Sequence, residues 1–336
     1  MKQYTVAVVG ATGLVGRTMI RILEQRNFPA HELRALARAH SAGTRLPFRG
    51  GEISVGELTP AAFDGVDIAL FSAGGDASRE WAPVAVERGA VVIDNSSAWR
   101  MHADVPLIVP EVNPQALTDA TPRIIANPNC STIQMVVVLK PLHDRYELCR
   151  VAVSTYQAVS GAGRKGLEQL AAEQRGETAA SPAFPHPIAS NVLPQIADFT
   201  ADGFTTEEHK MIDETRKILD LPALPVAPTC VRVPVADSHS EAVSATFVRD
   251  FELADVRSAL TDFPCLTLID DPAQAQYPLA ATARGRDDVF VGRLRRDPST
   301  DRGLMMWVVS DNLRKGAATN AVQIAELWCR LKEQEG

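Results

Sequence analysis

The stretch Val8-Val9-Gly10-Ala11-Thr12-Gly13-Leu14-Val15-Gly16 decides the fold. An apolar run that begins at Tyr4 precedes it and an amphipathic segment follows it, which is the context of a dinucleotide-binding turn between a strand and a helix. Gly10 can permit the tight turn, Gly13 the close approach of backbone to a pyrophosphate, and Gly16 the packing of the helix on the sheet. The spacing G-x-x-G-x-x-G is a variant of the usual G-x-G-x-x-G. An ordinary strand-to-helix turn is the alternative.

The first part of the chain alternates short apolar runs with longer amphipathic segments. Strands are expected at 4–9, 33–37, 66–72, 91–94 and 123–126, and helices at 14–25 and 79–88. Strand and helix in alternation indicate a parallel sheet with crossover helices. We therefore predict an α/β fold with a Rossmann-type dinucleotide-binding domain over residues 1–128.

The pattern changes from Val151 onward, where strands rich in β-branched residues are separated by polar turns. Strands are expected at 151–159, 229–235, 241–248, 289–295 and 304–310, helices at 207–219 and 317–332, and a long surface loop at 176–188. Such strands indicate a sheet with antiparallel pairs. We predict a second, α+β domain over residues 129–311. The C-terminal helix, within residues 312–336, is expected to pack back on the first domain.

Composition excludes several classes of protein. The 336 residues carry 34 Lys and Arg against 41 Asp and Glu, a formal net charge of −7, and no basic run could follow a nucleic acid backbone. Apolar runs fall well short of the roughly 20 residues that span a bilayer, and no signal peptide is recognisable. We therefore expect a cytoplasmic protein with neither nucleic acid nor membrane as a partner. The five cysteines are odd in number and lack C-x-x-C spacing, which argues against disulfides and against a metal site.

The residues after the second expected strand bear on the cofactor. Dinucleotide enzymes selective for NAD often place an acidic residue there, on the ribose 2′-hydroxyl. Here the chain reads Arg38-Ala39-His40-Ser41, without a carboxylate, and Arg38 could bind a phosphate through two parallel N–H bonds. This favours NADP. A solvated surface arginine is the alternative.

The stretch Asn127-Pro128-Asn129-Cys130-Ser131 is the most informative local signal for chemistry. Either Asn129 or Ser131 can cap a helix, and Ser131 with Gln134 fits an S-x-x-Q capping box. Cys130 would then lie at a helix N-terminus, where unpaired N–H groups stabilise a thiolate. We expect Cys130 to be a nucleophile. The role of small buried hydrophobe is assigned to the other cysteines, Cys149, Cys230, Cys265 and Cys329.

A thiolate beside a nicotinamide indicates a reaction class. The thiolate attacks an aldehyde, hydride leaves to the nicotinamide, and water, phosphate or coenzyme A resolves the thioester. Such a site needs an acid/base group, for which histidine is best suited near neutral pH. Among seven histidines, His239 follows a strand that also carries Arg232, whereas the other six lie in polar contexts.

Six segments together resemble the aspartate-semialdehyde dehydrogenase family, and the match runs through nearly the whole chain. In chain order they are 10–16, 127–131, 157–163, 230–234 with 239–241, 291–293 and 311–316. Any one could arise by chance, but six in the family's order are specific. The resemblance implies a homodimeric, NADP-dependent enzyme. It would reduce L-aspartyl 4-phosphate to L-aspartate 4-semialdehyde through a cysteine thioester, in the biosynthesis of lysine, threonine and methionine.

The resemblance also implies roles for individual residues. Cys130 would be the acyl-thioester nucleophile, and His239 the general acid/base. Gln157 would orient the substrate or the attacking water. Arg232 would hold the substrate carboxylate, a task for which its forked guanidinium suits better than lysine, and Glu207 would face the substrate amino group. The second domain is accordingly expected to be the catalytic and dimerisation domain.

Phosphate and cofactor contacts complete the expected site. Arg100 and Lys210 would bind inorganic phosphate, with solvated surface charges as the alternative. Gln157 could instead be a strand-end amide bonded to backbone, and Asn312 could be the N-cap of the terminal helix. The cofactor contacts expected from the glycine turn, from the residues after the second strand and from the resemblance are Gly10, Thr12, Gly13, Leu14, Val15, Arg38, His40, Ser41, Ser160, Gly161 and Asn312.

The chain departs from the family at one place. Members commonly carry a serine and an arginine two residues apart after the second strand, and here those positions hold Arg38 and His40. A neutral histidine holds a 2′-phosphate more weakly than arginine, so the NADP preference depends on Arg38. Two rivals remain open. One is an acyl-phosphate reductase for a longer substrate such as N-acetylglutamyl phosphate, against which Glu207 speaks, and the other is a catalytically silent dinucleotide-binding relative.

Overall fold

The structure is a computed structural model and describes residues 2–121 and 123–335. Contacts divide the chain into two compact units, one running up to Pro128 and resuming at Ala317, the other comprising Asn129–Gly316. From the sequence, the chain was expected to return to the first domain at Asn312. Residues 312–316 belong instead to the second unit, where the Asn312 side chain bonds Ser160 and the backbone of Ser238.

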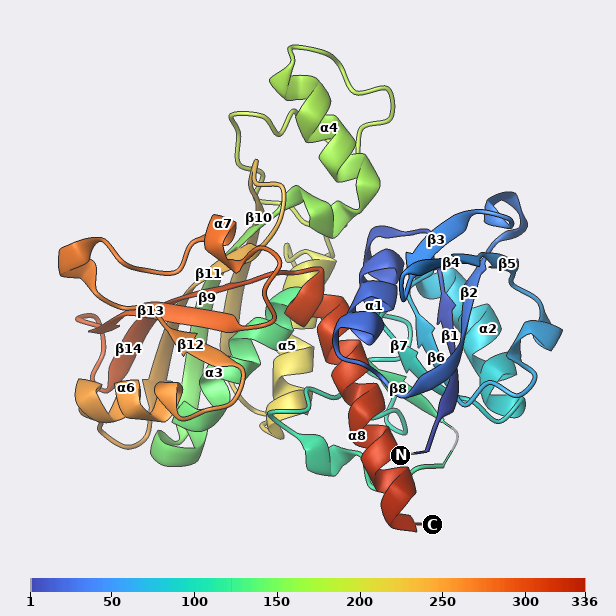
Figure 1. The fold of residues 1–336 in the computed structure, drawn as a ribbon. Coiled ribbons are helices and arrows are strands. Elements are labelled where there is room, and N and C mark those ends of the chain that lie inside the picture. The colour runs from blue at the N-terminus through green and yellow to red at the C-terminus, as the bar shows by residue number, and fades with distance from the viewer. Residues whose placement is uncertain (1, 122, 336) are drawn as a thin grey trace. The chain divides into compact units, whose positions relative to one another are not determined.

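The first unit contains a parallel sheet of six strands in the order β5-β2-β1-β6-β7-β8 (Figure 1). Its strands are β1 (Tyr4–Val9), β2 (Ala30–Ala37), β5 (Gly56–Glu57), β6 (Ile68–Phe71), β7 (Val91–Asp94) and β8 (Ile124–Ala126), its helices are α1 (Leu14–Gln25), α2 (Gly75–Glu87) and α8 (Thr319–Glu335), and β3 (Arg45–Phe48) pairs with β4 (Gly51–Ser54) as a separate hairpin. Adjacent strands of the large sheet pair in parallel throughout. This is the predicted α/β arrangement.

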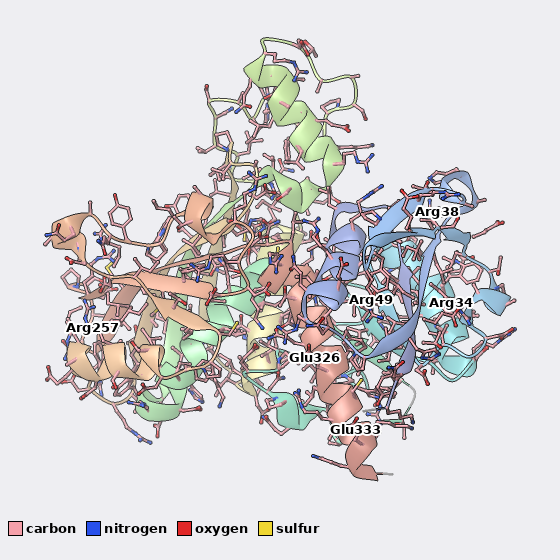
Figure 2. All side chains as sticks on the ribbon, in the orientation of Figure 1. Arg34, Arg38, Arg49, Arg257, Glu326 and Glu333 are labelled. Atoms are coloured by element: carbon pink, nitrogen blue, oxygen red, sulfur yellow. The ribbon has the colours of Figure 1, made fainter. Side chains whose placement is uncertain are left out.

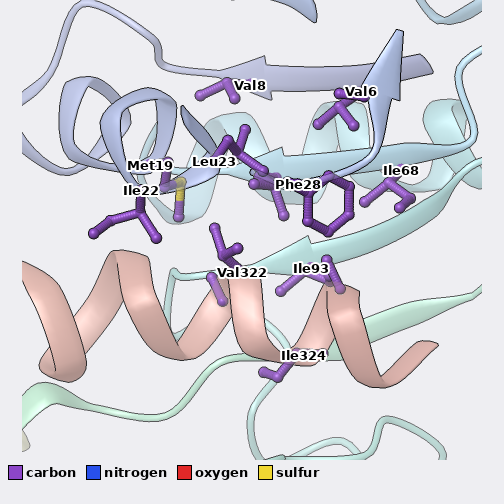
Figure 3. Close-up of a cluster of buried hydrophobic side chains, with 14 of the residues drawn as sticks. Val6, Val8, Met19, Ile22, Leu23, Phe28, Ile68, Ile93, Val322 and Ile324 are labelled. Carbon is purple, nitrogen blue, oxygen red and sulfur yellow. The ribbon is translucent and has the colours of Figure 1, made fainter. Parts of the chain in front are cut away.

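The helices of this unit cover both faces of the sheet. Val6 and Val8 of β1 pack in one cluster with α1 and α8 (Figure 3). Ala7 and Val9 pack with α2 on the opposite face. Trp328 of α8 contributes the largest ring to the first cluster. A valine, leucine, isoleucine, phenylalanine or methionine side chain contributes roughly 1.5–3 kcal/mol when fully buried. The C-terminal helix therefore packs on the first unit, as expected.

Polar contacts reinforce the contact between the first and last helices. Arg26, which follows α1, donates to both carboxylate oxygens of Glu326 on α8 at 2.7 Å (Figure 2). The ring of Trp328 meets that of Tyr4 edge-on, with centroids 5.9 Å apart. Partly exposed ion pairs contribute little, so burial of the apolar face dominates the docking of α8.

Two glycines of the glycine turn lie where there is no room for a side chain. Gly10 has φ of 83°, and a Cβ there would lie 2.5 Å from the Ser72 carbonyl oxygen. A Cβ at Gly16 would lie 2.2 Å from the Gly10 carbonyl oxygen, so α1 could not pack as closely with any other residue. No side chain caps α1 at Gly13. The N–H groups at this helix start therefore remain available to a ligand.

The second unit contains a sheet of six strands in the order β10-β9-β11-β14-β13-β12 (Figure 1). Its strands are β9 (Leu148–Gln157), β10 (Val226–Arg232), β11 (His239–Phe247), β12 (Leu266–Leu268), β13 (Val289–Arg296) and β14 (Gly303–Ser310), and its helices are α3 (Cys130–Tyr146), α4 (Arg164–Gln174), α5 (Thr206–Leu219), α6 (Leu253–Thr261) and α7 (Ala280–Ala283). Helices α3, α5 and α6 pack on the same sheet. Residues 176–188 form the expected loop, without helix or strand.

The pairing in this sheet corrects the sequence analysis in part. The antiparallel pairs were predicted, but β10 pairs with β9, and β12 with β13, in parallel. A parallel pair needs a long crossover connection. Between β9 and β10 the chain supplies one that contains α4 and α5, which is the physical reason for the difference.

Two cysteines also differ from expectation. Cys230 and Cys329 are buried, but Cys149 is exposed and Cys265 is half-buried, so neither of these two is a buried hydrophobe. Cys149 follows the buried Leu148 on β9, and side chains alternate between the faces of a strand. Over the part of the chain that the structure describes, no helix is both long and apolar enough to cross a bilayer.

Candidate active site

Cys130 is the first residue of α3 and is half-buried. Asn129 is the N-cap: its Oδ1 accepts hydrogen bonds from the N–H groups of Ser131 at 2.9 Å and Thr132 at 3.3 Å. The capping box proposed for Ser131 and Gln134 is not formed, because Ser131 Oγ and Gln134 Nε2 are buried without partners among the described residues. Asn129 occupies the capping position first, which leaves Ser131 inside the helix. Cys130 is thus at the helix N-terminus, as predicted.

Three neighbouring strands, β10, β9 and β11, bring three polar side chains close together. Arg232 ends β10 and is the register partner of Gln157, which ends β9. Ser240 pairs with Tyr156, which places His239, the first residue of β11, next to Gln157. Arg232, Gln157 and His239 are all buried. The structure therefore brings together three residues that lie far apart in the sequence.

Arg232 presents one edge of its guanidinium for a ligand. Its Nη1 donates to the carbonyl oxygen of Ala158 at 2.6 Å, and its guanidinium lies over the Phe184 ring, 5.6 Å from the centroid. Nε has no partner among the described residues. The opposite edge, formed by Nε and Nη2, can therefore donate two parallel bonds to a carboxylate. Electrostatic interactions with Glu207 and Cys130 place Arg232 near both.

His239 is held in one tautomer. The backbone N–H of Ala158 donates to Nδ1 at 3.0 Å, and because a backbone N–H can only donate, the neutral ring carries its proton on Nε2. Burial, followed by the positive charge of Arg232, lowers the pKa of His239 to about 3. Nε2 has no partner among the described residues. The ring is therefore a neutral hydrogen-bond donor with its donor atom unused.

Gly161 leaves room for this pair. A Cβ at Gly161 would come within 2.7 Å of Arg232 Nη1 and 3.4 Å of His239 Nε2. The sequence analysis expected Gly161 as a cofactor contact. Its absent side chain also allows Arg232 and His239 to approach the backbone closely.

Glu207 and Lys210 lie on the first turn of α5, which begins with a capping box between Thr205 and Glu208. Lys210 donates to Glu207 at 3.0 Å, and Gln157 Nε2 donates to Glu207 at 3.2 Å. Burial alone would raise the pKa of Glu207, but the charge and hydrogen bond of Lys210, with the bonds from the Asn129 and Gln157 amides, lower it to about 2. Glu207 is thus a buried, ionised carboxylate. Gln157 bonds a side chain here, not the backbone.

Ser160 and Asn312 hold each other in the second unit. Ser160 lies on η4 (Val159–Ala162), and Asn312 Nδ2 donates to its hydroxyl at 3.0 Å. Asn312 Oδ1 accepts from the backbone N–H of Ser238 at 2.9 Å. Asn312 does not act as the N-cap of the terminal helix. Asp311 Oδ1 instead accepts from the N–H groups of Leu313 at 2.9 Å and Arg314 at 3.1 Å, at the start of the helical turn Arg314–Ala318 that leads into α8.

The remaining candidates belong to the first unit. Arg100 is 6% exposed and donates to the carbonyl oxygens of Asn127 and Asn95 at 2.9 Å, so it is not a solvated surface charge. Arg38 and His40 are exposed where the chain leaves β2 (Figure 2). The other cofactor candidates of this unit follow β1 or β2, as expected from the sequence. Those after β1 are Gly10, Thr12, Gly13, Leu14 and Val15, and the one after β2 is Ser41.

Phe184 and Glu241 are residues near this site that were not predicted from the sequence. Phe184 lies in the loop expected at 176–188, and no local pattern signals its contact with Arg232. Glu241 is fully buried, and both carboxyl oxygens lack a partner among the described residues. Burial raises its pKa well above the ordinary value. Its position two residues after His239, on the same strand face, was the available signal.

Comparison with known proteins places this site in a family. The profile "Semialdehyde dehydrogenase, NAD binding domain" matches residues 5–120, and "Semialdehyde dehydrogenase, dimerisation domain" matches residues 139–315. The chain thus has the two domains of a semialdehyde dehydrogenase.

Individual relatives narrow the class. The aspartate-semialdehyde dehydrogenase of Aquifex aeolicus (strain VF5) is 54% identical, covering 96% of this chain and 97% of the relative. The crystal structure of aspartate semialdehyde dehydrogenase II from Vibrio cholerae, complexed with ASA, gives a TM-score of 0.94 at 46% identity and covers 98% of this chain and 99% of that one. That of Candida albicans, with NADP, gives 0.79 at 27% identity, with 98% and 99% covered. The chain belongs to the aspartate-semialdehyde dehydrogenase family.

Proposed function

We propose that the chain catalyses the NADPH-dependent reductive dephosphorylation of L-aspartyl 4-phosphate to L-aspartate 4-semialdehyde, in the biosynthesis of lysine, threonine and methionine. The reverse reaction consumes inorganic phosphate. One observation carries this proposal: a cysteine at a helix N-terminus shares a unit with a buried row of Arg232, Gln157 and His239 and with the ionised Glu207.

Cys130 is the proposed nucleophile. The dipole at the N-terminus of α3 and the nearby charge of Arg232 favour its thiolate. The sulfur attacks the acyl carbon of the acyl phosphate, the C–O bond to phosphate breaks, and phosphate leaves with the electron pair. The product on the enzyme is a thioester at Cys130.

Charged side chains are proposed to hold the substrate. The Nε–Nη2 edge of Arg232 would bind the substrate α-carboxylate, since its Nη1 is already occupied by Ala158. Glu207 would accept from the α-ammonium group. Arg100 and Lys210 would bind phosphate; Lys210 has three donors, one of which goes to Glu207.

For the second half of the reaction we propose that His239, expected from the sequence as the general acid/base, acts as a neutral hydrogen-bond donor. The thioester carbon would accept a hydride, which a reduced nicotinamide would supply when bound. The Nε2–H of His239 donates to the carbonyl oxygen as negative charge develops there. Collapse of the tetrahedral adduct releases the aldehyde and returns Cys130 as a thiolate. Gln157 orients the reacting group from the neighbouring strand.

The first unit fits a dinucleotide on two observations. Gly10 and Gly16 form a cradle that Cβ atoms would fill, and no side chain caps α1. We propose that the pyrophosphate binds at residues 10–15, with further cofactor contacts from Ser41 in this unit and Ser160, Gly161 and Asn312 in the second. Arg38, with His40, would hold the 2′-phosphate of NADP. The Candida albicans relative solved with NADP supports this choice.

A homodimer is proposed through the second sheet. The face opposite α3 carries Tyr156, which is 39% exposed, and Trp307, with ring centroids 5.4 Å apart. The neighbouring Ala242 and Ser244 are small, so a second sheet could approach closely. The match to a dimerisation domain over 139–315 supports a second copy of this chain as the occupant.

The decisive experiment is an activity assay in the direction that consumes phosphate. Protein, L-aspartate semialdehyde, NADP and phosphate are mixed, and the absorbance of reduced nicotinamide is followed. Cys130→Ser should lose turnover by several orders of magnitude yet still bind cofactor, whereas Cys149→Ser, at an exposed cysteine, serves as the control. Absence of a phosphate-dependent signal in the wild type would remove the proposed reaction. A higher rate with N-acetylglutamate semialdehyde would favour the longer-substrate rival.

A further inference from the structure

Asn129 makes hydrogen bonds on both sides of its amide. Its Oδ1 accepts from Ser131 and Thr132 and so caps the helix that carries Cys130. Its Nδ2 donates to Glu207 Oε1 at 2.8 Å. The side chain is 6% exposed, so water competes little for either bond. One amide therefore contacts the start of the nucleophile's helix and the carboxylate of α5 together.

The backbone of the same residue is also fixed. The Asn129 N–H donates to Glu214 Oε2 at 2.7 Å, and Glu214 is 1% exposed. Helix α5 thus holds Asn129 through two carboxylates, Glu207 and Glu214, spaced two turns apart. The amide has little freedom to rotate away from either partner.

The bonds to Glu207 are unequally shared between its oxygens. Oε1 accepts from Asn129 at 2.8 Å and from Gln157 at 3.2 Å, whereas Oε2 accepts from Lys210 at 3.0 Å. Each carboxylate oxygen offers about two lone-pair sites. Oε1 is therefore filled, and the open acceptor site is on Oε2. The two amides fix which oxygen a cationic group can approach.

We propose that Asn129 is a positioning residue that sets Glu207 to recognise an α-ammonium group while capping the helix of Cys130. The proposal rests on the proposed function and extends it to substrate choice. In this proposal the enzyme prefers acyl substrates that carry an α-ammonium group over substrates with the same carbon chain but no such group. The bond between Asn129 Nδ2 and Glu207 is responsible for this preference. The cap and the selection then depend on opposite ends of one amide.

Substitutions can separate the two ends. Asn129→Ser keeps a good cap and removes the donor to Glu207. Asn129→Ala removes both bonds. Asn129→Asp keeps the cap but places a second carboxylate against Glu207, where the two negative charges repel. Asn113→Ser is the matched control, because Asn113 is equally buried and also bonds through both ends of its amide, but in the first unit.

Two readouts test the proposal. The first is the ratio of kcat/KM for L-aspartate semialdehyde to that for succinate semialdehyde, which lacks the amino group. The second is the pH dependence of Cys130 alkylation by iodoacetamide. For Asn129→Ser we expect the ratio to fall roughly ten- to a hundredfold, as for loss of a charged hydrogen bond, with the alkylation profile unchanged. For Asn129→Ala we expect both to change, and for Asn129→Asp the profile should move to higher pH.

The outcomes distinguish this proposal from the proposed function. Wild-type protein that fails to turn over L-aspartate semialdehyde would overturn both. Normal wild-type turnover with an unchanged substrate ratio in Asn129→Ser would overturn the positioning role alone. A ratio that falls as much in Asn113→Ser as in Asn129→Ser would show a general loss of packing, and would equally overturn it.

Discussion

Gly316 lies directly against Cys130. A Cβ built at Gly316 would come within 2.9 Å of Cys130 Cβ and 3.4 Å of its Cα. A distance below 3 Å is too short for two carbon atoms that are not bonded, so a side chain at Gly316 would have to displace the nucleophile. The segment after β14 therefore packs closely against the Cα and Cβ of Cys130.

We expect Gly316→Ala to lower kcat roughly ten- to a hundredfold, because a misplacement of about 1 Å at a reacting group costs that much. Steady-state kinetics and the alkylation rate of Cys130 measure the effect. Gly51→Ala is the control, since a Cβ there meets only ordinary contact, 3.8 Å from the Phe48 carbonyl oxygen. Normal kinetics in Gly316→Ala would mean that the segment yields without cost.

Arg232→Lys should raise KM for L-aspartate semialdehyde roughly ten- to a hundredfold, with a smaller effect on kcat. Lysine cannot present two parallel donors, and it loses the planar contact with Phe184. Initial rates over a range of semialdehyde concentrations measure the split. Arg175→Lys, at an exposed pair with Glu177, is the control. A fall in kcat alone would instead connect Arg232 with the chemical step.

Arg38→Ala should raise KM for NADP roughly tenfold while leaving KM for NAD unchanged, because only NADP carries the 2′-phosphate. Arg45→Ala, at another exposed arginine that pairs with Glu52, is the control. His40→Arg should change the preference in the opposite direction. Equal use of NAD and NADP by the wild type would remove the role proposed for Arg38.

His239 should remain neutral, with its proton on Nε2, from about pH 5 to 8. Its pKa of about 3 in the folded chain lies below the ordinary 6.5. At pH values between these two, the unfolded chain therefore binds a proton on this ring that the folded chain does not. The stability that this ring contributes is therefore complete above about pH 6.5 and is lost as the pH falls toward 3. Nitrogen NMR of histidine-labelled protein measures the tautomer, and His239→Asn assigns the signal. A titration with a midpoint near 6.5 would contradict the prediction.

The local sequence pattern was enough to predict much of the secondary structure of the first unit. The bounds of β1, α1 and β7 are those predicted, because each is a buried run or an amphipathic segment with clear ends. The N-terminal position of Cys130 was also readable, since Asn and Pro end the strand before it. These features depend on neighbours in sequence, which one chain displays directly.

The rest depends on contacts between distant segments. The parallel pairing of β10 with β9 follows from the crossover between them, which periodicity does not reveal. The two bonds of Asn129 to α5, and the space that Gly161 leaves for Arg232 and His239, join residues far apart in the chain. Residue types suggested the chemistry of the site, but only the register of three strands gives its arrangement.

The residues proposed for catalysis and those proposed for coenzyme choice lie in different units. The sulfur, its cap, the buried carboxylate and the imidazole all lie within Asn129–Gly316, whereas the exposed loop after β2 belongs to the other unit. Under the proposed function, mutations in that loop would alter coenzyme choice without moving Cys130, Glu207 or His239. Arg38 and His40, which differ from the pattern expected of the family, both lie in this exposed loop.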